Sequence, residues 1–174
     1  SMNFPFTITR SLNWVQYEAI PRSWYPQRID REFLTFALIS MWDLAEPNAY
    51  LPHLVRDPLP GTPAKPLLFQ VAEGDLQVQT IAGDTAARTA GIPLLSPAVR
   101  PIWGLDEEEG PAESGYVYYD LGQELPPIEN LLPGDINTVH NDQRNLPAAR
   151  QQIDAFLAPG GAVLNFCDGA CDPE

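Results

Sequence analysis

Two residues that can act together in acid–base catalysis follow expected strands. Asp75 comes after the apolar run 66–72 and Gly74, and His140 lies 65 positions later in the polar segment 137–142. A histidine acts as a general base when a carboxylate accepts the proton of its other ring nitrogen, because this fixes the tautomer and stabilises the imidazolium. We therefore interpret Asp75 and His140 as a catalytic pair. Helix capping by Asp75 is the alternative.

Other ionisable residues compete for these roles. Asp135 and Asp142 flank His140 and are alternative carboxylate partners, although aspartates so close in sequence are more typical of turns. Arg144 can pair with any of these carboxylates. His53 precedes the acid and is interpreted as a packed or surface loop histidine.

Strands and helices alternate around the pair. The run 67–72 is typical of a strand buried on both faces, and 116–120 is the next clear strand. A helix is expected over 78–90 with Gly91 as its C-cap, and a last helix is expected after Asn145 as cap, with Pro147 in its first turn. This order predicts an α/β fold, a parallel-sheet layer with flanking helices. Its ligands would gather at the carboxyl ends of the strands.

The N-terminal third is aromatic and rich in proline. Residues 4–9 are expected to form a short strand or an extended arm, and residues 12–29 an aromatic loop. A helix capped by Asp30 is expected to continue to Pro47 with a broad apolar face. That face is interpreted as ordinary core or as a cover over an apolar pocket.

The segment around the acid resembles the α/β-hydrolase superfamily. Residues 66–78 are similar to the family segment in which a strand leads to Gly-Asp-x-x-Val and the aspartate is the triad acid, here Asp75. His140, followed by Asn-Asp-Gln-Arg and a helix, resembles the family's terminal histidine loop. The resemblance covers about residues 30–166, the C-terminal half of such an enzyme. It implies esterase- or lipase-like acyl hydrolysis by a Ser-Asp-His triad.

The nucleophile of that family is missing. None of the six serines has the flanking glycines of a Gly-x-Ser-x-Gly elbow; the nearest approach is Ser114, which precedes a strand where the elbow must follow one. We expect residues 3–57 to be a lid-like aromatic and helical segment, and residues 58–174 to be the C-terminal portion of the hydrolase. The isolated chain would then be inactive and would pair with a missing N-terminal half or with itself. The alternative is a non-catalytic α/β binding or assembly module.

Composition narrows the expected partners. The formal net charge of −13 argues against nucleic acid and anionic membrane surfaces, and no apolar run is long enough to span a bilayer. An apolar, ester-like small molecule is the expected substrate, with no cofactor and no metal. The acidic run 106–109 is interpreted as a solvated loop, and Ser1-Met2 as the remnant of a cleaved tag.

The two cysteines lie close to the C-terminus. Cys167 and Cys171 have the wrong spacing for a Cys-x-x-Cys redox motif, and no second pair of ligands supports zinc. We interpret them as a small disulfide loop, with free thiols as the alternative. A disulfide favours an oxidising compartment, so a secreted or periplasmic location is expected.

Overall fold

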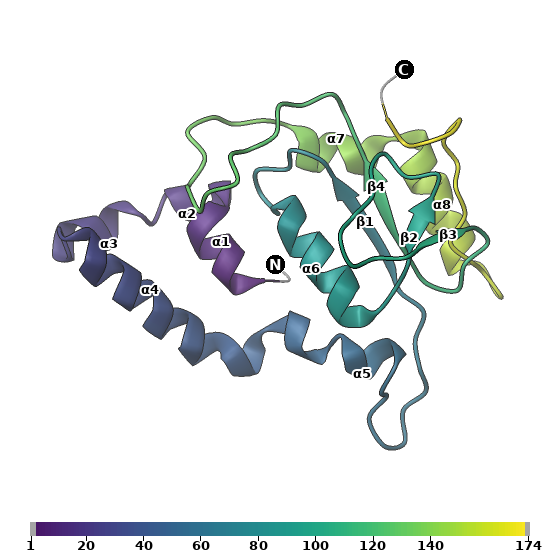
Figure 1. Cartoon of the computed structure of the whole chain (residues 1–174), viewed down its shortest axis with the longest axis horizontal. Helices are drawn as coiled ribbons and strands as arrows, with labels where there is room; N and C mark the ends of the chain where they lie inside the picture. The colour runs from purple at the N-terminus through teal and green to yellow at the C-terminus, as the bar shows by residue number, and fades with distance from the viewer. Residues whose placement is uncertain (1–2, 173–174) are drawn as a thin grey trace.

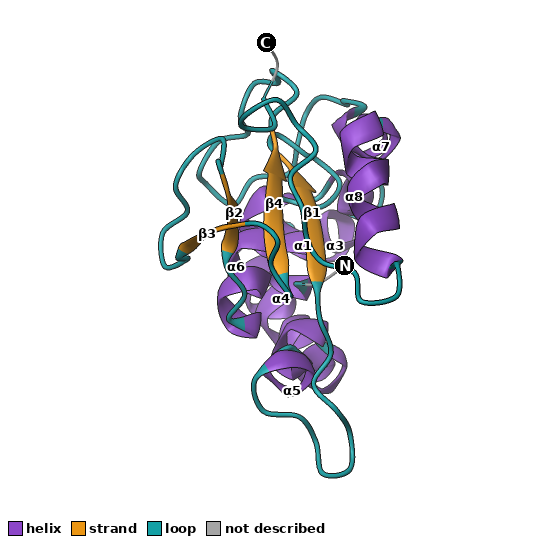
Figure 2. Cartoon of the chain, turned by 90° about the vertical axis from the view of Figure 1, so that its right-hand side faces the viewer, coloured by secondary structure: helices purple, strands orange, loops and turns teal. Residues whose placement is uncertain are grey.

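The computed structural model describes residues 3–172 and has the predicted α/β layout, a parallel sheet between helices (Figures 1 and 2). The remnant interpretation of Ser1-Met2 lies outside the described residues. The sheet has the strand order β1-β4-β2-β3, and all neighbours are parallel. Its strands are β1 (Leu68–Ala72), β2 (Leu94–Ser96), β3 (Glu107–Glu109) and β4 (Gly115–Tyr119).

Strand β4 contributes to two hydrophobic cores because its side chains alternate between the faces of the sheet. Tyr116 and Tyr118 belong to a cluster with three alanines, Ala86, Ala87 and Ala90, of α6 (Thr80–Ala90). Val117 and Tyr119 belong to a second cluster with Ala149 of α8 (Pro147–Leu157). All five residues of β4 are buried, as expected for a strand covered on both faces.

Two of the predicted helices form close to their expected positions. Helix α6 begins at Thr80 and ends at Ala90, and Gly91 follows in the left-handed conformation at φ 71°, so the predicted glycine C-cap is confirmed. Pro147 lies in the first turn of α8, also as predicted. The predicted cap at Asn145 is wrong, because Asn145 ends α7 (Val139–Asn145) and Leu146 precedes α8.

The N-terminal segment is helical, which corrects two predictions. Residues 4–9 form no strand or arm but belong to α1 (Phe4–Arg10), where the side chain of Asn3 accepts a hydrogen bond from the Phe6 amide and Pro5 lies in the first turn. The expected loop 12–29 contains α2 (Leu12–Val15), α3 (Ala19–Trp24) and the first residues of the next helix.

Helix α4 (Arg28–Trp42) is not part of the core. It begins before Asp30, which lies in its first turn instead of capping it, and none of its residues is buried. Phe33, Phe36 and Met41 are each at least 70% exposed. Figure 1 shows α4 as an arm that extends away from the sheet. The interpretation of its apolar face as core is therefore wrong.

Short helices connect the arm to the sheet. They are η1 (Asp43–Ala45), η2 (Pro47–Tyr50) and α5 (Pro52–Val55). Leu51, between the last two, is only 4% exposed and joins the cluster around α6. This part of the N-terminal third thus contributes directly to the core.

The acidic run is a strand and not the expected loop. Glu107–Glu109 form β3 at one end of the sheet, in register with Leu94–Ser96 of β2, and all three glutamates are exposed. Like charges at an exposed edge discourage pairing with another sheet.

The predicted disulfide is present at the C-terminal tail. Cys167 and Cys171 are bonded, and Cys171 is buried in the cluster that contains Val117 and Tyr119. The Asp120 amide donates to the Cys171 carbonyl at 2.8 Å, which fixes the tail beside the end of β4. None of the helices formed by residues 3–172 has the length and apolar character needed to cross a bilayer.

Opening this disulfide is expected to cost about 2 kcal/mol of unfolding free energy, the entropy associated with so short a loop. The measurement is urea unfolding of the chain with and without reductant. The double variant Cys167→Ser/Cys171→Ser is the control, since reductant should not change its midpoint. Equal midpoints for oxidised and reduced wild-type chain would show that the tail does not stabilise the fold.

Candidate active site

Strand β1 ends in a turn that presents Asp75. The Glu73 amide donates to the Tyr119 carbonyl at 2.7 Å, and the chain then turns at Gly74, where φ is +73°. A Cβ at this glycine would lie 3.1 Å from the Cβ of Gln123. Both the conformation and the close approach favour glycine here. The turn leaves Asp75 only 5% exposed at the carboxyl end of the sheet.

The two carboxylate oxygens of Asp75 have different partners. Oδ1 accepts from the Gln77 amide at 2.7 Å and from the Val78 amide at 3.0 Å, and Oδ2 lies 2.7 Å from Nδ1 of His140. The backbone bonds hold the turn before α6, whose own N-cap, Gln79, makes no side-chain cap. Asp75 therefore combines a local backbone role with a contact to a residue 65 positions away.

His140 lies in the second position of α7 and not in the expected loop. Asn137, three residues earlier, donates from Nδ2 to the Gly74 carbonyl at 2.8 Å, which ties the start of α7 to the turn that carries Asp75. Because an ionised carboxylate can only accept, the proton of the neutral imidazole belongs on Nδ1. Nε2 is then an acceptor, and no residue in 3–172 forms a hydrogen bond with it. The side chain is 26% exposed.

The competing residues are not bonded to the imidazole of His140. Asp142 accepts a hydrogen bond from the Thr138 hydroxyl, and Arg144 donates from Nε to the His140 carbonyl at 3.0 Å. Asp135 is exposed. His53 lies in α5, where Nδ1 is 3.4 Å from a carboxylate oxygen of Asp57. Of the carboxylates considered, Asp75 is the one that contacts His140.

The described serines do not contact His140. The hydroxyls of Ser11, Ser23 and Ser40 donate to backbone carbonyls. Ser96 donates to Glu107, and Ser114 accepts from the Leu67 amide. Both cysteines are in the disulfide. Among residues 3–172 no serine hydroxyl and no free thiol is therefore hydrogen-bonded to the base.

Comparison with family models, curated proteins and solved structures gives no match. The structure has the parallel sheet and helices expected of an α/β protein, and the family resemblance of the acid and histidine segments stays a prediction. So do the catalytic roles of Asp75 and His140. No group of three or more His, Cys, Asp or Glu side chains within residues 3–172 is arranged to hold a metal ion.

The N-terminal helices are bonded to the turn that follows Asp75. The Leu12 amide donates to the Leu76 carbonyl at 2.7 Å, and the hydroxyl of Ser11 donates to the Gln77 carbonyl at 2.6 Å. The side-chain amide of Gln79 donates to the Arg10 carbonyl at 2.7 Å. These bonds place the junction of α1 and α2 directly beside the candidate site.

A polar network that sequence reasoning missed lies next to the same turn. Glu73, whose side chain is 8% exposed, accepts from Nε of Arg100 at 2.8 Å and from the Tyr118 hydroxyl at 3.2 Å. The Arg100 guanidinium also lies 4.8 Å from the centre of the Tyr118 ring, in cation–π geometry. Burial is the main cause that raises the pKa of Tyr118 above its usual value, so its hydroxyl stays protonated.

Asp84 of α6 accepts a hydrogen bond from the Tyr116 hydroxyl at 2.7 Å. Burial raises the pKa of Asp84 above the usual aspartate value, although this hydrogen bond and the charges of Arg100 and Arg88 act in the opposite direction. When folding raises the pKa of an acid, that acid contributes stability at pH values below the pKa that it has in the unfolded chain. That contribution is lost as the pH rises through the folded pKa.

Asp84→Asn is therefore expected to stabilise the chain at pH 7 and to leave it unchanged near pH 3. The uncharged amide keeps an oxygen for the Tyr116 hydroxyl. A rise in Tm of roughly 2–4 °C at pH 7 corresponds to about 1 kcal/mol in a chain of this size. Thermal melts of both proteins at the two pH values are the measurement. A lower Tm at pH 7 would contradict the burial argument.

Proposed function

We propose that this chain supplies the acid and the histidine of a Ser-Asp-His triad in an α/β-hydrolase-like serine hydrolase. The observation that supports the proposal is the hydrogen bond between Asp75 and His140 at the carboxyl end of a parallel sheet, with no hydrogen bond from any of residues 3–172 to Nε2. The serine would come from a segment outside these 174 residues or from a second chain.

The proposed chemistry assigns one role to each residue. Nε2 of His140 removes the proton of the serine hydroxyl as the serine oxygen attacks the ester carbonyl. His140 then gives that proton to the departing alcohol, and water repeats the two steps on the acyl-enzyme. Asp75 holds the proton of Nδ1 in place and stabilises the imidazolium during each transfer.

Two further observations fit this proposal. Strand β1 is the end strand on the Asp75 side of the sheet, so a strand from the missing portion has an edge beside which it can pair. The disulfide is typical of proteins that fold in oxidising compartments, which supports a secreted or periplasmic enzyme. An apolar, ester-like small molecule is the proposed substrate.

A fluorophosphonate probe tests the proposal, because an activated serine hydroxyl displaces its fluoride and becomes phosphonylated. The full product of the source gene should be labelled on one serine outside the present chain, and His140→Ala should abolish labelling. His53→Ala, which changes the other histidine, is the matched control and should label normally. Labelling that survives in His140→Ala, or that fails in the unmodified full product, would reject the proposal.

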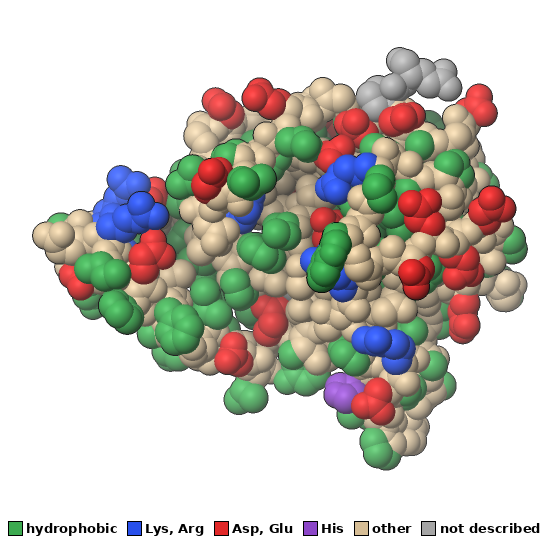
Figure 3. All heavy atoms as spheres, in the orientation of Figure 1, with side chains coloured by type: hydrophobic (Ala, Val, Ile, Leu, Met, Phe, Trp, Pro, Cys, Tyr) green, Lys and Arg blue, Asp and Glu red, His purple; other side chains and the backbone are tan. Residues whose placement is uncertain are grey.

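A non-catalytic binding or assembly module is the second candidate. The exposed aromatic side chains of α4 favour it, because Phe33 and Phe36 are about 70% exposed on a helix with no buried residue. Figure 3 shows hydrophobic side chains along the arm, with a cluster of basic side chains at its tip. A full gene product that fails to react with the fluorophosphonate would favour this second candidate.

A further inference from the structure

A cavity of about 410 Å³ adjoins the turn that carries Asp75. Leu76 and Gln79, which follow Asp75, line one side, and Asn137, which bonds to the Gly74 carbonyl, lines another. The long loop before α7 closes most of the remainder. The cavity lies in the size range of small-molecule sites.

Arg10 is the cation of this cavity, and its charge is buried. It is 7% exposed, and its guanidinium donates only to the carbonyls of Pro127 and Ile128. Within residues 3–172 no carboxylate lies within 4 Å of it. A guanidinium has five N–H donors, and a buried charge is costly unless an opposite charge accompanies it. The side chain is therefore suited to an anion in the cavity.

Asn137 lines the same cavity and carries an unpaired polar atom. Its Nδ2 is bonded to Gly74, but its Oδ1 is buried and has no hydrogen-bond partner. Buried polar atoms are rarely left unpaired, and such atoms commonly face a ligand or an ordered water. Arg10 thus offers the cavity a positive charge, whereas the Asn137 oxygen can accept only from a donor such as an ordered water or a hydroxyl and does not bind the carboxylate itself.

The other lining residues indicate the body of the ligand. Most of them are apolar: Leu76, Leu125, Pro126, Pro127, Leu131, Leu132, Pro133 and Ile136. The acidic members, Glu124 and Asp135, are both exposed, so solvent and salt screen their repulsion of an anion.

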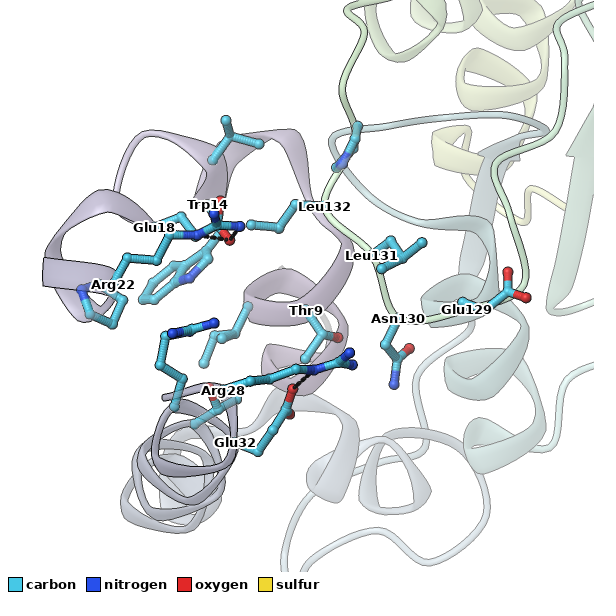
Figure 4. Close-up of a pocket in the computed structure, with 16 residues that line it drawn as sticks. Thr9, Trp14, Glu18, Arg22, Arg28, Glu32, Glu129, Asn130, Leu131 and Leu132 are labelled. Carbon is cyan, nitrogen blue, oxygen red and sulfur yellow. Dashed lines mark hydrogen bonds and ion pairs between the residues drawn. The ribbon is translucent and has the colours of Figure 1, made fainter. Parts of the chain in front are cut away.

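Three of these residues, Leu131–Pro133, also line a larger hollow of about 920 Å³ between the N-terminal helices and the same loop. Figure 4 shows Leu132 extending from the loop toward Trp14, on the side of the hollow that also carries Arg22 and Arg28. The arginines there are largely matched, since Arg22 pairs with Glu18 and Arg28 with Glu32. In the smaller cavity, by contrast, Arg10 is buried and has no carboxylate partner among residues 3–172.

We infer that the cavity beside Asp75 binds the carboxylate of a small organic acid with an apolar body, and that Arg10 is its counterion. The binding itself needs no catalysis. The inference rests on the proposed function in one respect only. With that function, the substrate is an ester that carries a free carboxylate.

Phenylacetate and phenylacetamide form a matched pair of probes, because they share an aromatic body and differ in charge. In an NMR titration of the 174-residue chain, phenylacetate should shift the amides of Leu76, Gln79 and Asn137. It should bind at least about tenfold more tightly than the amide, the scale of one charge-assisted contact. Equal affinities, or shifts confined to other residues, would overturn the inference.

Substitutions then identify the cation. Arg10→Met should remove the preference for phenylacetate, whereas Arg31→Met should preserve it. Arg31 is the matched control because it is half-buried, lines the larger hollow and also bonds only to carbonyls. A preference lost in Arg31→Met and kept in Arg10→Met would refute the assignment. If Arg10→Met fails to fold, the comparison of the two probes on the unmodified chain still decides.

The outcomes separate binding from hydrolysis. Phenylacetate should bind equally to His140→Ala, because His140 does not line the cavity. A chain that binds phenylacetate while the full gene product resists the fluorophosphonate would keep this site and reject the proposed function. A chain that does not bind phenylacetate, together with a full gene product that reacts with the fluorophosphonate, would keep the proposed function and reject this site.

Discussion

Asp75→Asn is expected to lower kcat for ester hydrolysis by about 10⁴-fold in a protein that includes the nucleophile. The asparagine can keep Oδ1 in place for the Gln77 and Val78 amides, so the turn should survive. Its NH₂ group would then face Nδ1 of His140. This favours the tautomer with the proton on Nε2, which cannot accept the proton of a serine.

Stability distinguishes this effect from unfolding. The Tm of Asp75→Asn should stay close to that of the wild type, and kcat should fall at unchanged protein concentration. Asp142→Asn is the matched control, because Asp142 lies two residues after His140 and bonds to Thr138 instead. A loss of activity below about tenfold in Asp75→Asn, or an equal loss in the control, would remove Asp75 from the proposed triad.

Arg100→Met is expected to give the largest loss of stability, about 3 kcal/mol of unfolding free energy. Removing the guanidinium leaves the carboxylate of Glu73 buried without its counterion, and such changes typically cost 3–5 kcal/mol. We take the lower end of that range because the Arg100 side chain is itself 43% exposed and partly screened.

A double-mutant cycle in urea measures this coupling directly. Glu73→Gln should recover part of the loss caused by Arg100→Met, because the double variant no longer buries an unpaired charge. Arg22→Met breaks the exposed pair with Glu18 and should cost less than about 1 kcal/mol. If Arg100→Met costs no more than Arg22→Met, the Glu73–Arg100 contact does not hold the end of β1.

The central elements of the fold were predictable because their signals are local. The run around β1 is apolar except for Gln70, and Gly91 has no Cβ to oppose a left-handed C-cap. Strands β2 and β3 have three residues each, too few to show a period, and three glutamates do not favour a strand. Their pairing depends on neighbours that only the folded chain brings together.

The N-terminal third was mispredicted for two different reasons. At Asn3 and Pro5 a local capping signal was present and was overlooked. At α4 the apolar spacing correctly predicted a helix, but spacing cannot show whether a face has a partner. Its aromatic side chains are exposed because no other described segment covers them.

The sequence predicts one part of the candidate site and gives no sign of another. The contact between Asp75 and His140 was predictable because each follows a strand of one parallel sheet, which brings both to the same edge. Arg10 gave no such signal. Its importance comes from burial against carbonyls 117 and 118 positions away, and a single sequence carries no trace of that proximity.

The most direct test of the account is hydrolysis of a short-chain aryl ester by the full product of the source gene, compared with its His140→Ala and His53→Ala variants. If Asp75 and His140 act as a pair, His140→Ala loses activity by at least about 10³-fold while His53→Ala keeps it. Full activity in His140→Ala, or equal losses in both variants, would contradict the proposed acid–base pair.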